Sequence, residues 1–190
     1  TASATATVTV NPLPNATAAA SPATICVGQS STITATGGGT YLWSNNATTA
    51  AITVNPVTTT TYTVTVTAAN GCTKTATATV TVNPLPTVTA TPVPSTICNG
   101  QNSTITATGG GTYLWNNGAT TAAITVTPTT TTTYTVVVTN AAGCTASATA
   151  TVTVNPLPNA SASAFPATIC QGQSTELSAS GGGTYLWNTG

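Results

Sequence analysis

The sequence repeats itself with a constant period, and this period constrains the fold more than any other feature. Residues 85–156 repeat residues 13–84, and only 17 of the 72 positions differ. A chain of this kind is expected to be built from one small unit used several times. Three strings mark the period: NPLP begins at Asn11, Asn83 and Asn155, TIC ends at Cys26, Cys98 and Cys170, and GGGTYLW ends at Trp43, Trp115 and Trp187.

The period divides the chain into two whole repeats and two partial ones. Residues 13–84 and 85–156 are the whole repeats. Residues 1–12 are identical to 145–156, so they are predicted to form the C-terminal strand of a preceding repeat. Residues 157–190 are predicted to form the N-terminal part of a following repeat. We therefore expect the natural polypeptide to continue in both directions.

Charged side chains are almost absent from this sequence. Lys74 and Glu176 are the only two, and there is no His, whereas about a quarter of the residues of a typical soluble domain are charged. Without basic residues to neutralise phosphates, the chain is not predicted to bind nucleic acid or a charged membrane surface. No apolar run of about 20 residues predicts direct membrane insertion. A net charge of zero removes repulsion between molecules, which favours association.

Apolar and polar residues alternate with the period of two that is typical of β-strands. In 76–82 the even positions are Ala or Val and the odd positions are Thr. Similar alternation predicts strands in 61–67 and 50–54, around 33–35 and 41–43, and within 15–20. The three glycines Gly37–Gly39 are predicted to form a turn, and no helical period appears. Six or seven short strands per repeat, each with one apolar face, predict an all-β fold of two-sheet sandwiches.

Each whole repeat contains two cysteines, and their spacing is the same in both repeats. This equal spacing predicts one disulfide inside each repeat, Cys26–Cys72 and Cys98–Cys144, with the partner of Cys170 outside the chain. Free thiols and a zinc site are the alternatives, but zinc normally needs four Cys or His ligands and the chain has no His. Stable disulfides indicate an oxidising, extracellular or cell-surface location.

Other repeated residues have structural interpretations. The tryptophan of GGGTYLW and the tyrosine of TTTYTV are predicted to fill the sandwich core: Trp43, Tyr62, Trp115, Tyr134 and Trp187. An exposed sugar platform at Trp43, and an ice- or sugar-binding ladder in the Thr58–Thr61 run, are the alternatives. The prolines of NPLP are predicted to stiffen the linkers: Pro12, Pro14, Pro84, Pro86, Pro156 and Pro158. Sugars would explain solubility without charge, and the candidate glycosylation sites are Asn15, Asn46, Asn102 and Asn159.

The combined motifs resemble a known repeat family. The runs PATIC-x-GQS, GGGTYLW, TTTYTV and GCT, followed by TVTVNPLP, resemble the immunoglobulin-like (PKD-like) repeats of large Bacteroidetes cell-surface proteins. The resemblance covers the whole chain and implies tandem immunoglobulin-like β-sandwich domains, each one repeat period long. It also implies stalks of adhesins, gliding-associated proteins or secreted enzymes, often exported by a type IX system. Calcium binding does not carry over to this chain, because it has no Asp to coordinate the ion.

Catalytic groups are missing from the repeats. Acid–base catalysis needs a His, a carboxylate, a Lys or a similar group, yet the first whole repeat has one Lys and no acid, and the second has neither. Ser and Thr are plentiful, but no base is present to activate them. The chain is therefore predicted not to be an enzyme and to use no cofactor and no metal.

Three classes of function remain. The sequence favours a structural repeat array of an extracellular surface protein, a stalk or filament with an adhesive or self-assembling role. Glycan- or surface-binding modules, or spacer domains of a secreted enzyme, are the alternatives. The predicted partners are other copies of the chain or neighbouring repeats, with surface glycans as a second class.

Lateral association would use exposed strand edges. If the strands in 73–82 and 145–154 lie at sheet edges, only Lys74 guards one of them with charge. Natural sheet edges are usually protected by charge or proline. Neighbouring domains or chains are then expected to cover these edges, by β-augmentation or by lateral packing.

Overall fold

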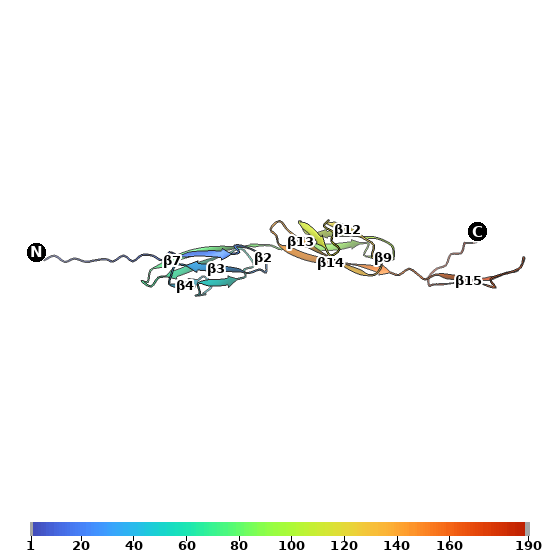
Figure 1. The fold of residues 1–190 in the computed structure, drawn as a ribbon, viewed down its shortest axis with the longest axis horizontal. Helices are drawn as coiled ribbons and strands as arrows, with labels where there is room; N and C mark the ends of the chain where they lie inside the picture. Colours follow the sequence, from blue (N-terminus) through green and yellow to red (C-terminus); the bar gives the residue numbers. More distant parts are fainter. Residues whose placement is uncertain (1, 189–190) are drawn as a thin grey trace. The chain divides into compact units, whose positions relative to one another are not determined.

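The computed structural model describes residues 2–188, and every regular element in this range is a β-strand (Figure 1). The first group of strands is β1 Thr17–Ser21, β2 Thr24–Cys26, β3 Ser31–Thr36, β4 Thr40–Trp43, β5 Ala51–Val54, β6 Thr60–Thr67 and β7 Thr73–Asn83. The second group is β8 Thr89–Val93, β9 Thr96–Cys98, β10 Ser103–Thr108, β11 Thr112–Trp115, β12 Ala123–Val126, β13 Thr132–Thr139 and β14 Thr145–Asn155. Two more strands follow, β15 Ser161–Phe165 and β16 Glu176–Ser180.

The chain forms two compact units whose borders do not coincide with those of the repeats. The first unit contains the residues up to Thr87 together with 109–111 and 138–146. The second contains 88–108, 112–137 and the residues from 147 onward. The turn before β14 therefore belongs to the same unit as β1–β7.

Each seven-stranded group is a two-sheet sandwich. In the first, one sheet has the order β1-β3-β5 and the other has the order β2-β7-β6-β4. All pairs are antiparallel except β2–β7, which is parallel. This is the order of immunoglobulin strands A-B-E and A′-G-F-C, without strand D. The second group repeats it, as β8-β10-β12 and β9-β14-β13-β11, so the chain has tandem immunoglobulin-like sandwiches.

The alternation in the sequence sets which side of each strand is buried. Val64 and Val66 of β6 are fully buried, and Ala78 and Val80 of β7 lie beside them in the core. The intervening threonines point outward and pair across the two strands in register, Thr61 with Thr79 through Thr67 with Thr73. A one-residue slip would turn every valine to solvent, so burial fixes this register.

The core of each sandwich contains a tryptophan. Trp43 is buried and its indole Nε1 donates to the carbonyl oxygen of Thr49 at 2.9 Å. Trp115 is buried in the same way, and its Nε1 donates to Thr121 at 2.9 Å. The indole is thus placed in the core with its one polar group satisfied, and the sugar-platform alternative for Trp43 is wrong.

Strand β2 is the element that the sequence pattern missed. It is only three residues long and has no alternation to identify it. It forms because Thr24, Ile25 and Cys26 pair in parallel with the last three residues of β7, Thr81–Asn83. Ile25 then lies in the core, with 2% of its surface exposed. The other predicted strands agree with β1 and β3–β7 to within a few residues.

The predicted sheet edge at 73–82 exists only in part. β7 pairs with β6 from Thr73 to Val80, and its last residues pair with β2. β1 of the opposite sheet also packs against β7. Strand β14 likewise lies between β13 and β9. Residues 81–83 of the predicted edge are therefore paired within the repeat, whereas residues 73–80 have a strand partner on one side only, β6.

Residues 157–188 form an incomplete sandwich. Only the antiparallel pair β15–β16 is present, which corresponds to β1 and β3 of the first repeat. Trp187, predicted to be a core residue, is 43% exposed, against 1% for Trp43. The difference has a direct cause, because no strands corresponding to β6 and β7 lie over it in the described chain.

We expect Trp43→Ala to lower the free energy of unfolding by about 3–5 kcal/mol, because it removes the largest buried side chain and leaves a cavity. Leu42→Ala is the matched control, since Leu42 is the neighbouring residue and is 53% exposed. It should change stability by only about 0.5 kcal/mol. Urea unfolding of both variants measures the difference, and equal losses would contradict the assigned core.

Candidate functional site

One disulfide is formed in the described chain, and it connects two different repeats. Cys26, at the end of β2, is bonded to Cys144, immediately before β14, with a Cα–Cα distance of 5.7 Å and a sequence separation of 118. The predicted pairs Cys26–Cys72 and Cys98–Cys144 are therefore wrong. Cys72, Cys98 and Cys170 have free thiols in this structure.

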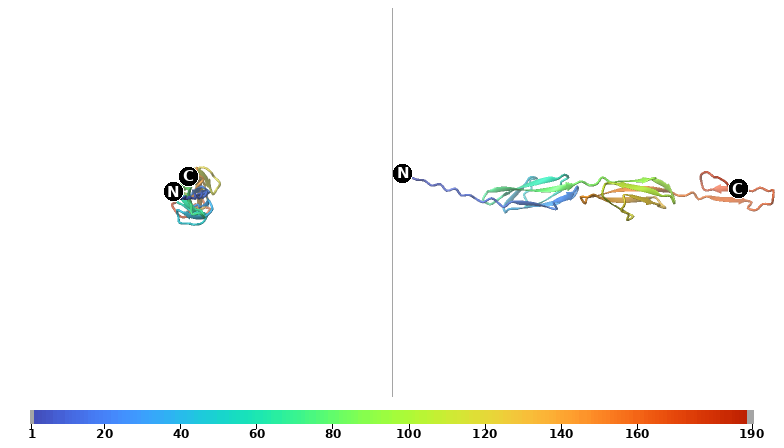
Figure 2. Two further views of the ribbon diagram at one scale, coloured as in Figure 1. Left: turned by 90° about the vertical axis from the view of Figure 1, so that its left-hand side faces the viewer. Right: turned by 90° about the horizontal axis from the view of Figure 1, so that it is seen from above.

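The length of β7 explains why the two cysteines of one repeat do not meet. Cys72 directly precedes β7, whereas Cys26 lies opposite Asn83, the last of its 11 residues. The strands run lengthwise in each sandwich (Figure 2), and a strand rises about 3.3 Å per residue. Cys26 and Cys72 are thus separated by roughly 35 Å, whereas a disulfide requires Cα atoms within about 7 Å.

On the Cys26 side of the bond, the motif C-x-G-Q forms a tight turn. The amide of Gln29 donates to the carbonyl of Cys26 at 3.0 Å, and the Gln29 side-chain Oε1 accepts from the Cys26 amide at 3.0 Å. Gly28 has φ +90°, which favours glycine. The amide of Val27 donates to the carbonyl of Asn83 at 3.0 Å, which ties the turn to the end of β7.

The Cys144 side is a turn organised by one asparagine. The Oδ1 atom of Asn140 accepts from the amides of Ala142 and Cys144, both at 3.0 Å. Its Nδ2 atom donates to the carbonyl of Pro84 in the NPLP linker at 3.0 Å. The Cys144 sulfur lies 3.9 Å from the carbonyl oxygen of Asn83. Asn140 thus fixes the cysteine and the linker against each other.

The asparagine was not identified from the sequence, because its position differs between the repeats. Asn70 has the same role in the first repeat. Its Oδ1 accepts from the Cys72 amide at 3.0 Å, and its Nδ2 donates to the carbonyl oxygen of Pro12 at 3.1 Å. A shift of one period from Asn70 leads to Ala142, not to Asn140. Both repeats have an asparagine within four residues before the Gly-Cys pair, and this shared feature, rather than the same position in the repeat, could have identified it.

A hollow of about 280 Å³ lies beside the disulfide. Its lining includes Cys26, Gln29, Leu85, Cys144 and Thr145. None of its lining residues is charged. Within residues 2–188 there is also no group of three or more His, Cys, Asp or Glu side chains that could hold a metal. The chemistry available at this site is that of the disulfide itself.

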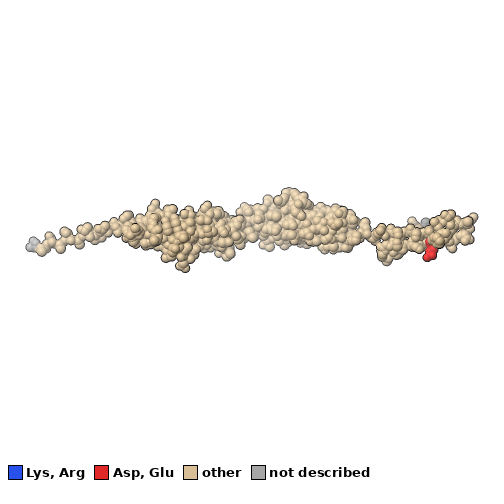
Figure 3. Space-filling model, turned by 60° about the horizontal axis from the view of Figure 1, so that its bottom comes forward, with Lys and Arg blue, Asp and Glu red and all other residues tan. Residues whose placement is uncertain are grey.

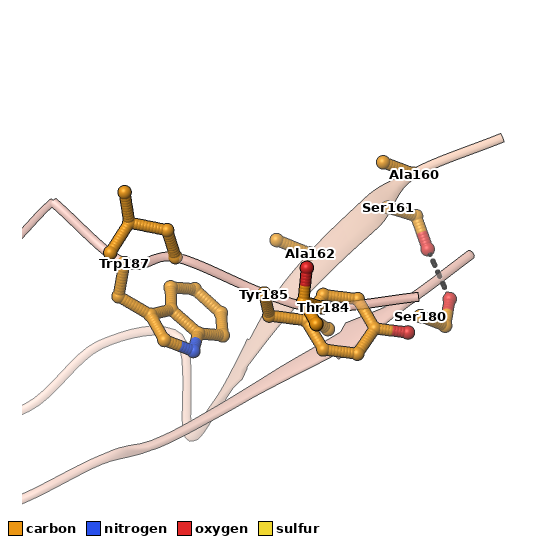
Figure 4. Close-up of a pocket in the computed structure, with 9 residues that line it drawn as sticks. Ala160, Ser161, Ala162, Ser180, Thr184, Tyr185 and Trp187 are labelled. Carbon is orange, nitrogen blue, oxygen red and sulfur yellow. Dashed lines mark hydrogen bonds between the residues drawn. The ribbon is translucent and has the colours of Figure 1, made fainter. Parts of the chain in front are cut away.

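A larger hollow of about 420 Å³ lies between the β15–β16 pair and residues 184–187 (Figure 4). Trp187 and Tyr185 face it, and the Ser161 and Ser180 hydroxyls form a 2.6 Å hydrogen bond at its rim. In the first repeat the residues corresponding to Ala179 and Trp187 are Ala35 and Trp43, both of which are buried. This hollow is therefore the uncovered core of a sandwich and not a ligand pocket.

The remaining predicted residues lie in different environments. Tyr62 and Tyr134 are half-buried and line the margin of the core rather than its centre. Of the linker prolines, Pro14 is buried, Pro86 is half-buried, and the others are exposed: Pro12, Pro84, Pro156 and Pro158. All four asparagines of the glycosylation sequences are exposed: Asn15, Asn46, Asn102 and Asn159.

The surface is nearly uncharged. Figure 3 shows one face with Glu176 as its charged group, and Lys74 is the second exposed charge of the described chain. The outer faces carry hydroxyls instead, and some bond across strands, as in Thr61–Thr79 at 2.8 Å and Thr17–Thr36 at 2.6 Å. No helix in the described part is long and apolar enough to cross a membrane.

Comparison with known proteins finds solved structures of similar fold. No model of a known family matches the chain, and no curated protein matches it. Murine CEACAM1b is similar with 14% identity and a TM-score of 0.38, over 75% of this chain and 100% of that one. A Ca²⁺-stabilized adhesin that helps an Antarctic bacterium bind ice has 21% identity and a TM-score of 0.40, over 80% of this chain and 52% of its own.

The N-terminal four Ig domains of Dscam1 isoform 6.9 are similar at 15% identity, with a TM-score of 0.31 over 70% of this chain and 43% of that one. The chain thus spans about half of the adhesin and less than half of the Dscam1 fragment. With scores this low, the strand order and not these matches defines the fold class, and none of the matches carries a functional argument.

We expect Asn140→Ala to lower the free energy of unfolding by about 1–2 kcal/mol, because the amides of Ala142 and Cys144 lose their acceptor. Hydrogen exchange at the Cys144 amide should accelerate. Asn117→Ala is the matched control, because Asn117 accepts from a single amide in another turn, that of Ala119. Unchanged exchange at Cys144 in the Asn140 variant would contradict the role assigned to this side chain.

Proposed function

We propose that this chain is a structural segment of an extracellular surface protein, a stalk or filament in which consecutive repeats are joined by a disulfide as well as by the linker. The observation that carries the proposal is the Cys26–Cys144 bond. An enzyme or a ligand-binding module has no need to connect neighbouring repeats covalently. A segment that bears tension gains directly from a second covalent path.

The bond restricts how far the chain is able to extend. It closes a loop of 118 residues, which on the chain-entropy model stabilises the folded state by about 5 kcal/mol. When tension is applied at the two ends, the residues inside the loop are protected from it, even after their sandwiches unfold. Without the disulfide, the linker alone would not limit the extension of the chain.

The same bond and the surface support the proposed extracellular location. Disulfides persist in oxidising compartments outside the cytosol, which supports an extracellular or cell-surface location. An uncharged, threonine-rich surface supports close packing with other copies, because no electrostatic repulsion opposes it. We also propose sugars on the exposed asparagines or threonines, which would keep such a surface soluble.

We further propose that the chain belongs with the Bacteroidetes immunoglobulin-like surface repeats that its motifs resemble, and that it reaches the surface by type IX export. We propose no catalytic activity for it. One Lys and one Glu in 190 residues, with no His, leave no acid–base pair within a repeat. Catalysis or adhesion by the natural protein would then reside in other domains.

Single-molecule stretching of the full chain between its two ends tests the proposal. With the disulfide intact, the contour length at full extension should be shorter by about 400 Å than in the Cys26→Ser/Cys144→Ser variant, because the 118 residues of the loop do not extend. A reducing agent added to the unmodified chain should release the same length in one step.

Cys72→Ser/Cys98→Ser is the matched control, since it also removes two cysteines but breaks no bond in this structure. Its contour length should equal that of the unmodified chain. If the unmodified chain extends as far as the Cys26/Cys144 variant under oxidising conditions, the proposed load-bearing role is wrong.

A further inference from the structure

Asparagine is followed directly by glycine at three places in the chain: Asn70-Gly71, Asn99-Gly100 and Asn117-Gly118. Such a pair is chemically reactive, because the backbone nitrogen of the glycine is able to attack the side-chain carbonyl carbon of the asparagine. Glycine favours the attack, since it has no Cβ to hinder the approach and its backbone is conformationally free. In a folded chain the reaction is slowed wherever hydrogen bonds hold the attacking nitrogen or the side chain.

The pair at Asn70 is held by three hydrogen bonds. The Asn70 Oδ1 atom accepts from the amide of Cys72 at 3.0 Å, and its Nδ2 atom donates to the carbonyl oxygen of Pro12 at 3.1 Å. The amide of Gly71, which would supply the attacking nitrogen, donates to the carbonyl oxygen of Ala68 at 2.9 Å. Both reacting groups are therefore engaged, and their bonds must open before the attack.

The pair at Asn117 is held in a similar way. The Asn117 Oδ1 atom accepts from the amide of Ala119 at 3.2 Å. The amide of Gly118 donates to the carbonyl oxygen of Trp115 at 2.9 Å. The attacking nitrogen is again engaged, here with the backbone of a buried core residue.

The pair at Asn99 differs from the other two. Among residues 2–188, neither the Asn99 side chain nor the Gly100 amide takes part in a hydrogen bond. Both residues are exposed, and no atom lies within 4 Å of the place that a Cβ of Gly100 would occupy. The attacking nitrogen and its target are therefore both free to move toward each other.

A bonded junction leaves the same place open to water. In the first repeat Val27 and Gly28 occupy this place, and they line the hollow beside the disulfide. Val27 is 37% exposed and Gly28 is also exposed. The Gly28 amide likewise has no hydrogen bond to any described residue. The accessibility of the Asn99 pair therefore does not depend on whether Cys98 is bonded.

We propose that Asn99 is a site of spontaneous modification, at which the asparagine is converted to aspartate and isoaspartate. Asn70 and Asn117 are protected from the same reaction by their hydrogen bonds. The inference does not rest on the proposed load-bearing function, because it depends only on the turn that follows β9.

The reaction needs only water. The nitrogen of Gly100 forms a bond to Cγ of Asn99, the bond between Cγ and Nδ2 breaks, and Nδ2 leaves as ammonia with the proton of the Gly100 amide. The intermediate is a five-membered succinimide ring. Water then cleaves the ring nitrogen from one of its two carbonyl carbons. Cleavage at Cγ gives aspartate, and cleavage at the backbone carbonyl gives isoaspartate, in which the chain continues through Cγ.

Either product changes the turn and its surface. The chain has one Lys, one Glu and no net charge, so the new carboxylate leaves it with a net negative charge, which opposes association between equally modified copies. Isoaspartate also adds one backbone atom between residues 99 and 100. The hydrogen bond from the amide of Gln101 to the carbonyl oxygen of Cys98, now 3.0 Å long, spans this point and would be lost.

The test incubates the full chain at neutral pH in ¹⁸O-labelled water and locates the label by tandem mass spectrometry of chymotryptic peptides. Label enters only where a succinimide opens, so it marks conversion during the incubation. We expect aspartate and isoaspartate at residue 99, with conversion at Asn70 and Asn117 slower by about tenfold or more, because hydrogen bonds must first open there. Hydrogen exchange at the Gln101 amide should accelerate in the converted fraction.

Asn99→Gln is the matched control, since glutamine stands at the equivalent position of the following repeat, Gln171. Its longer side chain would have to form a six-membered ring, which closes more slowly, so residue 99 should stay unlabelled. In urea, where the fold no longer protects any pair, all three asparagines should convert at similar rates.

Three results would overturn the inference. The first is faster conversion at Asn70 or Asn117 than at Asn99 in the folded chain. The second is no label at residue 99 over the time in which the chain in urea is converted. The third is the same ratio of rates in urea as in the folded chain, because the order would then come from local sequence and not from the hydrogen bonds.

Discussion

Strand β7 spans its sandwich from the turn that carries Cys72 to the strand that carries Cys26. A β-strand is nearly inextensible along its axis, so these two cysteines are held apart by its 11 residues. Each repeat consequently presents one cysteine at each end of the sandwich. A cysteine at one end has no partner within its own repeat, and its bond must be made to another. The strand length thus prevents a bond within one repeat, and the turns at the junction place Cys26 and Cys144 for a bond between repeats.

The same constraint shows where the sequence was informative and where it was ambiguous. The alternation of Val and Thr predicted β6 and β7 well, because burial of one face enforces a period of two. The periodicity of the chain, however, makes every cysteine spacing constant, whether it is the spacing within a repeat or the separation of 118 between Cys26 and Cys144. Equal spacing therefore did not distinguish a bond within a repeat from a bond to the next one. The position of the three-residue strand β2, which is too short for alternation to identify, decides between them, because it places Cys26 at the far end of β7 from Cys72.

The two asparagines show a second limit of alignment by position. Asn70 and Asn140 hold their linkers and cysteines through the same hydrogen bonds, although they lie two positions apart in the repeat. A short turn allows this, because an amide side chain reaches the same backbone groups from either position. Position-by-position comparison counts two differences here, whereas the physical interaction is unchanged. Trp187 shows that an identical motif can lie in a different environment. Its GGGTYLW motif is unchanged, but its ring is 43% exposed because only two strands, β15 and β16, form around it in the described chain.

The placement of the cysteines at opposite ends of a sandwich has a mechanical consequence for the proposed array. If Cys72 is bonded to a preceding repeat and Cys98 to a following one, the covalent path between the two bonds is only the short segment 72–98. This segment consists of β7, the NPLP linker, β8 and β9, which are already extended strands or proline-stiffened chain. Tension applied through these two bonds, rather than at the ends of the chain, would pass along this short path, and residues 99–143 would lie outside it. Because extended strands have little slack, such an array would resist stretching without relying on the stability of its sandwiches. A small domain with a marginal core would then be sufficient as a building block, since its main role is to hold β7 and the cysteines at its two ends in place.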